Sequence, residues 1–190
     1  MRRGEIGGLA VLVRLYEVRA VRTAYLITRD HALAEDVVQN AFLRAYERIG
    51  QLDPARPFGP WFMRSVVNAA IQAARRQERE LSLDAAVLSG PGDLTFADLL
   101  PDTAPNPDDQ VERAELRQAI WEALGKLTPD QRAAVIQRYY LDLSDEEMAE
   151  RLAIRPGTVR WRLHAARQRL RALLARHARE YRPPHGQEAE

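Results

Sequence analysis

The chain has 190 residues, enough for one medium domain or two small ones of roughly 70 residues each. Its composition, 46% apolar and 29% charged, is that of an ordinary globular protein, and no stretch approaches the ~18 apolar residues of a membrane span. The absence of cysteine excludes disulfides and thiolate metal sites. Because the amino terminus also lacks the pattern of a secretory signal, we expect a cytoplasmic protein without membrane insertion.

The net charge of +1 conceals an uneven distribution. Residues 1–79 carry 13 arginines against 8 acids, residues 80–110 carry 7 acids and no base, and residues 111–190 carry 15 bases against 12 acids. Between residues 154 and 182, nine arginines face one acid, Glu180. This pattern indicates two basic lobes joined by an acidic connector.

The first half of the chain predicts three helices. Strand signals are nearly absent, whereas apolar residues recur with the 3.6-residue period of a helix. We expect a first helix from about Leu9 to Thr28, and a second that begins near His31 and stops at Gly50. Gly59 and Pro60 favour the N-cap and first position of a third helix over 61–79. These three helices can enclose one small core.

Residues 80–110 interrupt the helical period. This stretch contains the segment Ser89-Gly90-Pro91-Gly92 and prolines at 101, 105 and 107, with acids between short apolar pieces. It predicts an acidic, extended linker of about 30 residues. Because a structureless loop of that length is unusual inside one compact domain, the linker favours two domains.

The second half predicts four more helices. The first covers about Val111–Leu124. Thr128-Pro129-Asp130-Gln131 is a capping box that starts a helix to about Tyr140, and Ser144-Asp145-Glu146-Glu147 is another, which starts a short helix to Leu152. After a tight turn, the last helix runs from Pro156 to about Ala178, and 181–190 is expected to be disordered.

The segment from Leu143 to Leu170 is the most informative. A short capped helix, a tight turn and a longer basic helix are the arrangement of a helix-turn-helix, whose second helix enters the major groove of DNA. Six apolar residues are spaced to bury the angle between the helices: Met148, Ala149, Leu152, Ile154, Val159 and Leu163. A single face of the second helix carries Arg160, Trp161, His164, Arg167 and Gln168. The alternative is a helical hairpin whose arginines only solvate a surface.

Three motifs in this half resemble the C-terminal domain of sigma-70 family factors. They are Leu127–Arg132, Leu143–Glu150 and Gly157–Arg167, and they look most like the short extracytoplasmic-function (ECF) group, whose C-terminal domain reads the −35 promoter element. In the first half, the segment Ala34–Tyr46 is similar to the helix with which that family binds the polymerase clamp. Phe58 and Trp61, with Arg64, Val67 and Asn68, look like its −10-reading segment.

The resemblance implies an all-α protein of two small helical domains, with binding residues in each. A region 2-like domain would cover 1–79, the acidic linker 80–110, a region 4-like domain 111–178 and a disordered tail 179–190. The side chains expected to dock the polymerase clamp are Asp36, Gln39, Asn40 and Arg44. Those expected near the −10 element are Arg64, Asn68, Gln72, Arg75 and Arg76. Those expected at the −35 element are Arg155, Thr158, Arg160, Trp161, Arg162, His164 and Arg167.

The implied partners are core RNA polymerase, promoter DNA and an anti-sigma factor, with no cofactor. The four histidines are scattered, so we expect no metal site, and no set of residues argues for catalysis, so we expect no enzyme. Trp161 stands where the family commonly has a small residue, and it would either meet a thymine methyl or pack against its own domain. We interpret Trp61 and Phe58 as anchors in the core or a loop, in preference to side chains that stack on bases. A stand-alone helix-turn-helix regulator is the alternative function, and it would need a dimerisation surface or a ligand pocket in the first half.

Overall fold

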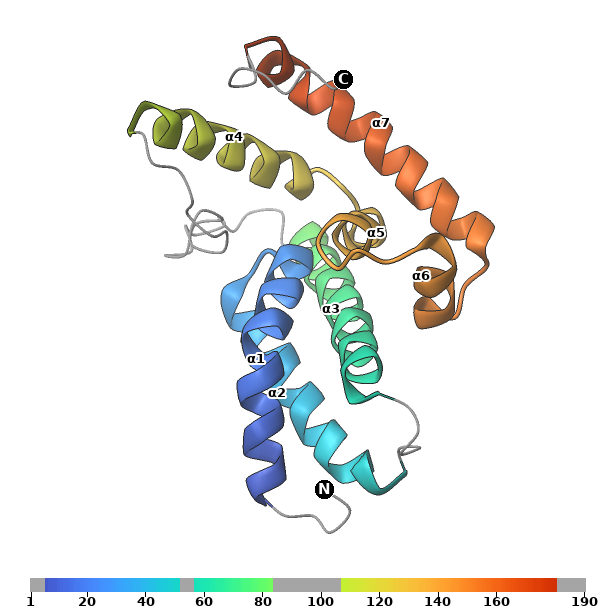
Figure 1. The fold of residues 1–190 in the computed structure, drawn as a ribbon. Helices are drawn as coiled ribbons and strands as arrows, with labels where there is room; N and C mark the ends of the chain where they lie inside the picture. Colours follow the sequence, from blue (N-terminus) through green and yellow to red (C-terminus); the bar gives the residue numbers. More distant parts are fainter. Residues whose placement is uncertain (1–5, 52–56, 84–106, 181–190) are drawn as a thin grey trace, which may run out of the picture.

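Helices and the short turns between them make up the described part of the chain. The computed structural model describes residues 6–51, 57–83 and 107–180, and no strand occurs among them. The elements are α1 (Ile6–Thr28), α2 (His31–Arg48), the 3₁₀ turn η1 (Ile49–Gln51), α3 (Phe58–Leu83), α4 (Pro107–Gly125), α5 (Pro129–Tyr139), α6 (Asp145–Leu152) and α7 (Pro156–Glu180). We call α1–α3 the N-terminal lobe and α4–α7 the C-terminal lobe (Figure 1). The prediction of an all-α fold is confirmed.

The N-terminal lobe is a bundle of three helices around an aromatic centre. Phe62 is fully buried and stacks on Phe42 of α2, with ring centroids 4.4 Å apart, and on Phe58, 5.4 Å away. Tyr16 of α1 packs against the same rings. The buried face of α2 is the one that its helical period predicts: Ala34, Val37, Val38, Ala41, Phe42 and Ala45. Asp30 caps this helix by accepting the N–H of Leu33 at 2.9 Å.

The predicted bounds of α3 are wrong at both ends. The helix begins at Phe58, before the expected N-cap Gly59, and continues to Leu83, past Arg79. Pro60 is then the third helical residue, where its missing N–H costs nothing because the first four N–H groups have no partner within the helix. The aromatic contacts of Phe58 explain the earlier start, because they hold this residue against α1 and Trp61.

Both capping boxes of the C-terminal lobe are confirmed. The Thr128 hydroxyl accepts the N–H of Gln131, whose side chain accepts the N–H of Thr128, and Ser144 and Glu147 make the same pair of bonds. Ala153 ends α6 in the left-handed region at φ 54°, which turns the chain toward α7. Met148, Ala149, Val159 and Leu163 are buried, and Leu152 and Ile154 are partly buried against them, as expected for a helix-turn-helix.

The predicted linker is too long at both ends. Residues 80–83 belong to α3 and residues 107–110 belong to α4. Pro107 opens α4 at the first helical position, which proline tolerates. The rest of the expected acidic linker, 84–106, and the expected disordered tail, 181–190, lie outside the described residues. Residues 179 and 180 are the last of α7, so the tail was predicted two residues too early.

The two lobes pack on each other through α5, which lies against α1 and α3 (Figure 1). Buried residues of both lobes form one continuous cluster, from Ile27 and Phe62 to Leu124 and Ile136. At its edge Trp121 of α4 stacks on Tyr25 of α1 with centroids 4.9 Å apart. Trp121 therefore joins the lobes as well as packing within its own, which the sequence did not indicate.

Candidate nucleic-acid and polymerase interfaces

The second helix of the helix-turn-helix, α7, divides into a buried and an exposed face. Val159, Leu163 and Ala166 are buried against α5 and α6. The opposite face exposes the predicted reading row, Arg160, Trp161, His164, Arg167 and Gln168. Trp161 has 66% of its surface exposed, so it does not pack against its own domain. Arg155 is exposed and Thr158 half-buried at the start of the same helix.

Two arginines expected at the −35 element make contacts within the chain. The Arg167 Nε donates to the hydroxyl of Tyr139 at 2.9 Å, although both side chains stay exposed. Arg162 is different, because its side chain is only 15% exposed and its guanidinium pairs with Asp130 of α5 at 2.7 Å. Arg162 is therefore not free to meet phosphate in this arrangement.

The residues expected near the −10 element form one row along α3. Arg64, Gln72 and Arg76 are exposed, whereas Asn68 and Arg75 are partly covered. The cover comes from the C-terminal lobe, because the Asn68 Nδ2 donates to the Arg151 carbonyl at 3.4 Å and Arg75 binds Asp130. Two members of the predicted −10 set thus contact the other lobe.

A groove of about 900 Å³ lies between α2 and α3. It brings together three of the residues expected to bind polymerase and three of those expected near the −10 element: Asp36, Asn40, Arg44, Asn68, Gln72 and Arg76. Gln39 is exposed on α2 outside the groove lining. Trp61 lines the groove while packing on Phe58 and the core, which agrees with its reading as an anchor. Arg48, Ser65 and Gln77 also line it and were not singled out from the sequence.

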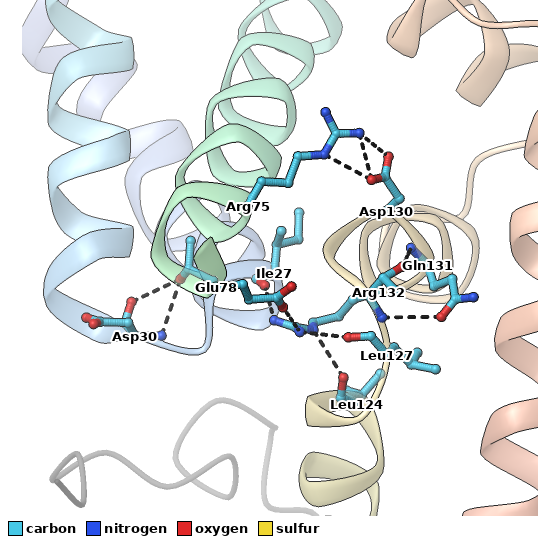
Figure 2. A network of polar contacts seen from close by, with 11 residues as sticks. Ile27, Asp30, Arg75, Glu78, Leu124, Leu127, Asp130, Gln131 and Arg132 are labelled. Carbon is cyan, nitrogen blue, oxygen red and sulfur yellow. Dashed lines mark hydrogen bonds and ion pairs between the residues drawn. The ribbon is translucent and has the colours of Figure 1, made fainter. Parts of the chain in front are cut away.

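A polar network across the lobe boundary was not foreseen from the sequence (Figure 2). Asp130 at the start of α5 accepts the Arg75 Nε at 3.0 Å and Nη2 at 2.7 and 2.6 Å, and its Oδ1 also pairs with Arg162. A carboxylate held by two guanidinium groups is a strong, charge-assisted contact. From the sequence, Asp130 is predicted only to lie in a helix-capping box.

Arg132, two residues further on, lies in the interior with 3% of its surface exposed. Its guanidinium donates to the carbonyl oxygens of Ile27, Leu124 and Leu127 and pairs with Glu78 at 3.1 Å (Figure 2). Burial lowers the pKa of Arg132, and the negative charge of Glu78 opposes that shift. The network connects α1, α3, α4 and α5 through one side chain.

Neither a metal site nor a membrane span emerges from the described residues. No three His, Asp or Glu side chains within 6–51, 57–83 and 107–180 gather to hold an ion. Within the same residues no helix has the length and apolar character to cross a bilayer.

The fold and these surfaces define a class of protein. A helix-turn-helix with an exposed arginine row, packed against a three-helix lobe with a large polar groove, is the architecture of a two-lobed helical DNA-binding protein.

Comparison with known proteins identifies the family. Residues 12–80 match the sigma-70 region 2 model, and residues 117–170 match the sigma-70 region 4 model. The ECF RNA polymerase sigma factor SigW of Bacillus subtilis is 31% identical over 174 residues, which are 92% of each chain. The ECF sigma factor SigL of Mycobacterium tuberculosis is 33% identical over 178 residues, covering 90% of this chain and 93% of the relative. The chain belongs to the ECF group of the sigma-70 family.

Solved structures share the fold. The sigma factor RpoE of Bartonella quintana, in complex with the anti-sigma factor NepR, superimposes with a TM-score of 0.65 at 22% identity, over 90% of this chain and 98% of that one. CnrH in complex with the cytosolic domain of CnrY superimposes with a TM-score of 0.61 at 22% identity, over 92% of each chain. In both cases the similarity lies in the arrangement of the helices.

Proposed function

We propose that this chain joins core RNA polymerase and directs it to promoters, with α7 reading the −35 element and α3 the −10 element. The observation that carries the proposal is the division of α7, which buries Val159 and Leu163 and presents Arg160 and Trp161 to solvent. In a helix-turn-helix the residues near the start of the second helix meet base edges. We further propose that the chain has no catalytic activity of its own and acts in the cytoplasm, with the polymerase.

Within α7, base reading is assigned to the start of the exposed row. An arginine can contact the O6 and N7 of guanine with two hydrogen bonds, and a tryptophan can cover a thymine methyl. Arg160 and Trp161 are neighbours on this exposed row, so they support adjacent base contacts. Arg155, Thr158, Arg162, His164 and Arg167 complete the proposed −35 surface, where phosphate contacts fix the register.

The N-terminal lobe supports two contacts at once. Asp36, Gln39, Asn40 and Arg44 lie exposed on α2 and are assigned to the polymerase clamp. Arg64, Asn68, Gln72, Arg75 and Arg76 follow α3 and are assigned to the −10 element. Because Asp36 and Asn40 share one groove with Asn68 and Gln72, polymerase and melted promoter DNA would meet along the same cleft. Unstacking a base costs a few kcal/mol, which a pocket and a basic track can offset.

We also propose that an anti-sigma factor controls the chain. The sigma factor RpoE named above was solved in complex with the anti-sigma factor NepR, and the present chain has its helical arrangement. The partner would have to cover the α2–α3 groove or the exposed face of α7 to prevent initiation.

Promoter selection from a random DNA pool with the assembled holoenzyme tests the assignment of the two reading helices. The wild-type chain should enrich a two-part motif. Arg160→Ala should reduce base preference in the upstream part only, by about 1–3 kcal/mol for the contacted base pair, and Asn68→Ala in the downstream part only. Arg171→Ala, which removes an exposed arginine of α7 beyond the reading row, is the control. Equal weakening of both parts by either substitution would refute the division of labour.

A further inference from the structure

The Asp130 carboxylate connects the two surfaces proposed to bind DNA. Arg75 comes from α3 in the N-terminal lobe and Arg162 from α7 in the C-terminal lobe, and both guanidinium groups contact this one carboxylate. Asp130 is only 22% exposed, and its two partners are 41% and 15% exposed. The contact is thus shielded from solvent more than an ordinary surface ion pair, whose contribution is small.

The partners of Asp130 are guanidinium groups, which also bind phosphate. A guanidinium binds a carboxylate and a phosphate with the same two-bond geometry, so Asp130 occupies the donors that DNA phosphates would otherwise occupy. A second contact has the same effect, because Asn68, assigned to a −10 base, donates to the Arg151 carbonyl at the end of α6. The C-terminal lobe therefore covers donors of both proposed DNA surfaces.

A chain in this closed arrangement cannot contact both promoter elements at the same time. The −10 and −35 elements are about 25 base pairs apart, a separation of about 85 Å on straight B-form DNA at 3.4 Å per base pair. Arg75 and Arg162 cannot reach both elements while they share one carboxylate. The chain between Leu83 and Pro107 permits separation, because its 24 residue steps can span about 80 Å when extended.

We propose that Asp130 is an internal latch. Its contact with Arg75 holds the two lobes of the free chain closed, and its contacts with Arg75 and Arg162 occupy both arginines in place of promoter phosphates. The inference rests on the proposed function for its consequence, but the latch itself is a property of the isolated chain. Two features position the lobes, namely the apolar contacts around Trp121 and the buried Arg132. The latch is the part of the boundary for whose arginines DNA competes directly. Opening exposes Asn68 and Arg75 together, whereas Arg162 lies in the same lobe as Asp130 and is released only when DNA phosphate displaces that carboxylate.

Single-molecule energy transfer on the free chain tests the latch. Because the natural chain has no cysteine, Glu47→Cys on α2 and Arg171→Cys on α7 give two specific labelling sites in exposed positions. The labelled chain that retains Asp130 should show mainly a population with high energy transfer. Asp130→Asn, which keeps the shape and removes the charge, should increase the low-transfer fraction at least threefold. Glu115→Gln, which removes one exposed acid from α4 of the same lobe, should leave it unchanged.

A second pair of variants guards against a folding effect at Asp130, which also begins α5. Arg75→Gln should open the chain as Asp130→Asn does, whereas Arg64→Gln, on the same helix but without a contact to Asp130, should not. Circular dichroism should show unchanged helix content in all four variants. If Asp130→Asn and Arg75→Gln leave the transfer distribution as their controls do, the latch does not exist. This measurement uses neither polymerase nor DNA, so its failure is distinct from failure of the proposed function.

The affinity for duplex DNA of random sequence tests the competition. Asp130→Asn and Glu115→Gln change the net charge equally, so non-specific attraction rises equally in both. If the latch withholds arginines from DNA, Asp130→Asn should bind at least threefold more tightly than Glu115→Gln. Equal dissociation constants would overturn the proposal, even if the lobes had separated.

Discussion

Arg132 is a buried side chain whose hydrogen bonds join the two lobes. Its guanidinium serves three carbonyl oxygens and the Glu78 carboxylate while almost wholly buried. Burying an arginine is costly, as the lowered pKa of this group reflects, and these four acceptors offset that cost.

Replacing Arg132 with alanine should therefore lower the free energy of unfolding by about 3–5 kcal/mol, because it leaves buried carbonyl oxygens without donors. Urea denaturation followed by circular dichroism measures the change. Arg171→Ala, at an exposed position of α7, should change it by less than about 0.5 kcal/mol. A loss below about 1 kcal/mol at Arg132 would mean that water replaces the guanidinium, and the network would not be structural.

At this scale the sequence predicts what is local. The capping bonds of Thr128 with Gln131 and of Ser144 with Glu147 join residues three apart, and both were predicted. The partners of Arg132 were not, because Ile27 and Glu78 are 105 and 54 positions away. The same holds for Asp130 and Arg75, which are 55 positions apart. Contacts between residues so far apart in the sequence leave no periodic pattern from which they could be predicted.

The elements themselves were predicted better than their ends. All seven α-helices follow from periodicity and capping signals, yet α3 begins at Phe58 and α4 at Pro107, both earlier than expected. In α3 the cause is tertiary, because Phe58 packs on Tyr16 of α1. The close approach of α1 also explains a glycine here, since a Cβ on Gly59 would lie 2.8 Å from the Tyr16 hydroxyl oxygen.

Two helical glycines give a matched test of that packing. Gly59→Ala should destabilise the N-terminal lobe by about 1–3 kcal/mol, because Tyr16 has to move away from Phe58 and Phe62. Gly157→Ala, in the first turn of α7, meets nothing within 4 Å and should be neutral or stabilising by up to about 1 kcal/mol. Thermal unfolding of the two variants decides the matter. If Gly59→Ala melts at or above the wild-type temperature, α1 and α3 are not in close contact there.

The sequence indicated which helix faces carry the candidate site residues, but not how those faces come together. Helical spacing puts most of the expected side chains on exposed faces of α2, α3 and α7, whereas Asn68, Arg75 and Arg162 are partly covered. The shared groove between α2 and α3 depends on how the helices cross, and the cover on Asn68 and Arg75 depends on the other lobe. Such long-range placement could not be read from spacing.

At the scale of the whole molecule, polymerase binding and DNA reading should be separable. Asp36 is exposed on α2 in the groove, and Asp36→Ala should weaken assembly with core polymerase at least tenfold while leaving DNA binding by α7 unchanged. Glu35→Ala removes a neighbouring acid of the same helix that does not line the groove, and should assemble normally. Gel filtration with core polymerase and a DNA mobility assay measure the two properties. Normal assembly by Asp36→Ala would move the clamp contact elsewhere.

Run-off transcription with purified core polymerase, the purified chain and a promoter selected from a random pool tests whether the chain directs initiation. Core polymerase alone should start at no defined position. With the chain added, a single start site should appear, and Arg160→Ala should diminish it. A chain that neither joins core polymerase nor confers a start site, with no inhibitor present, would contradict the assignment of α2, α3 and α7 to promoter recognition.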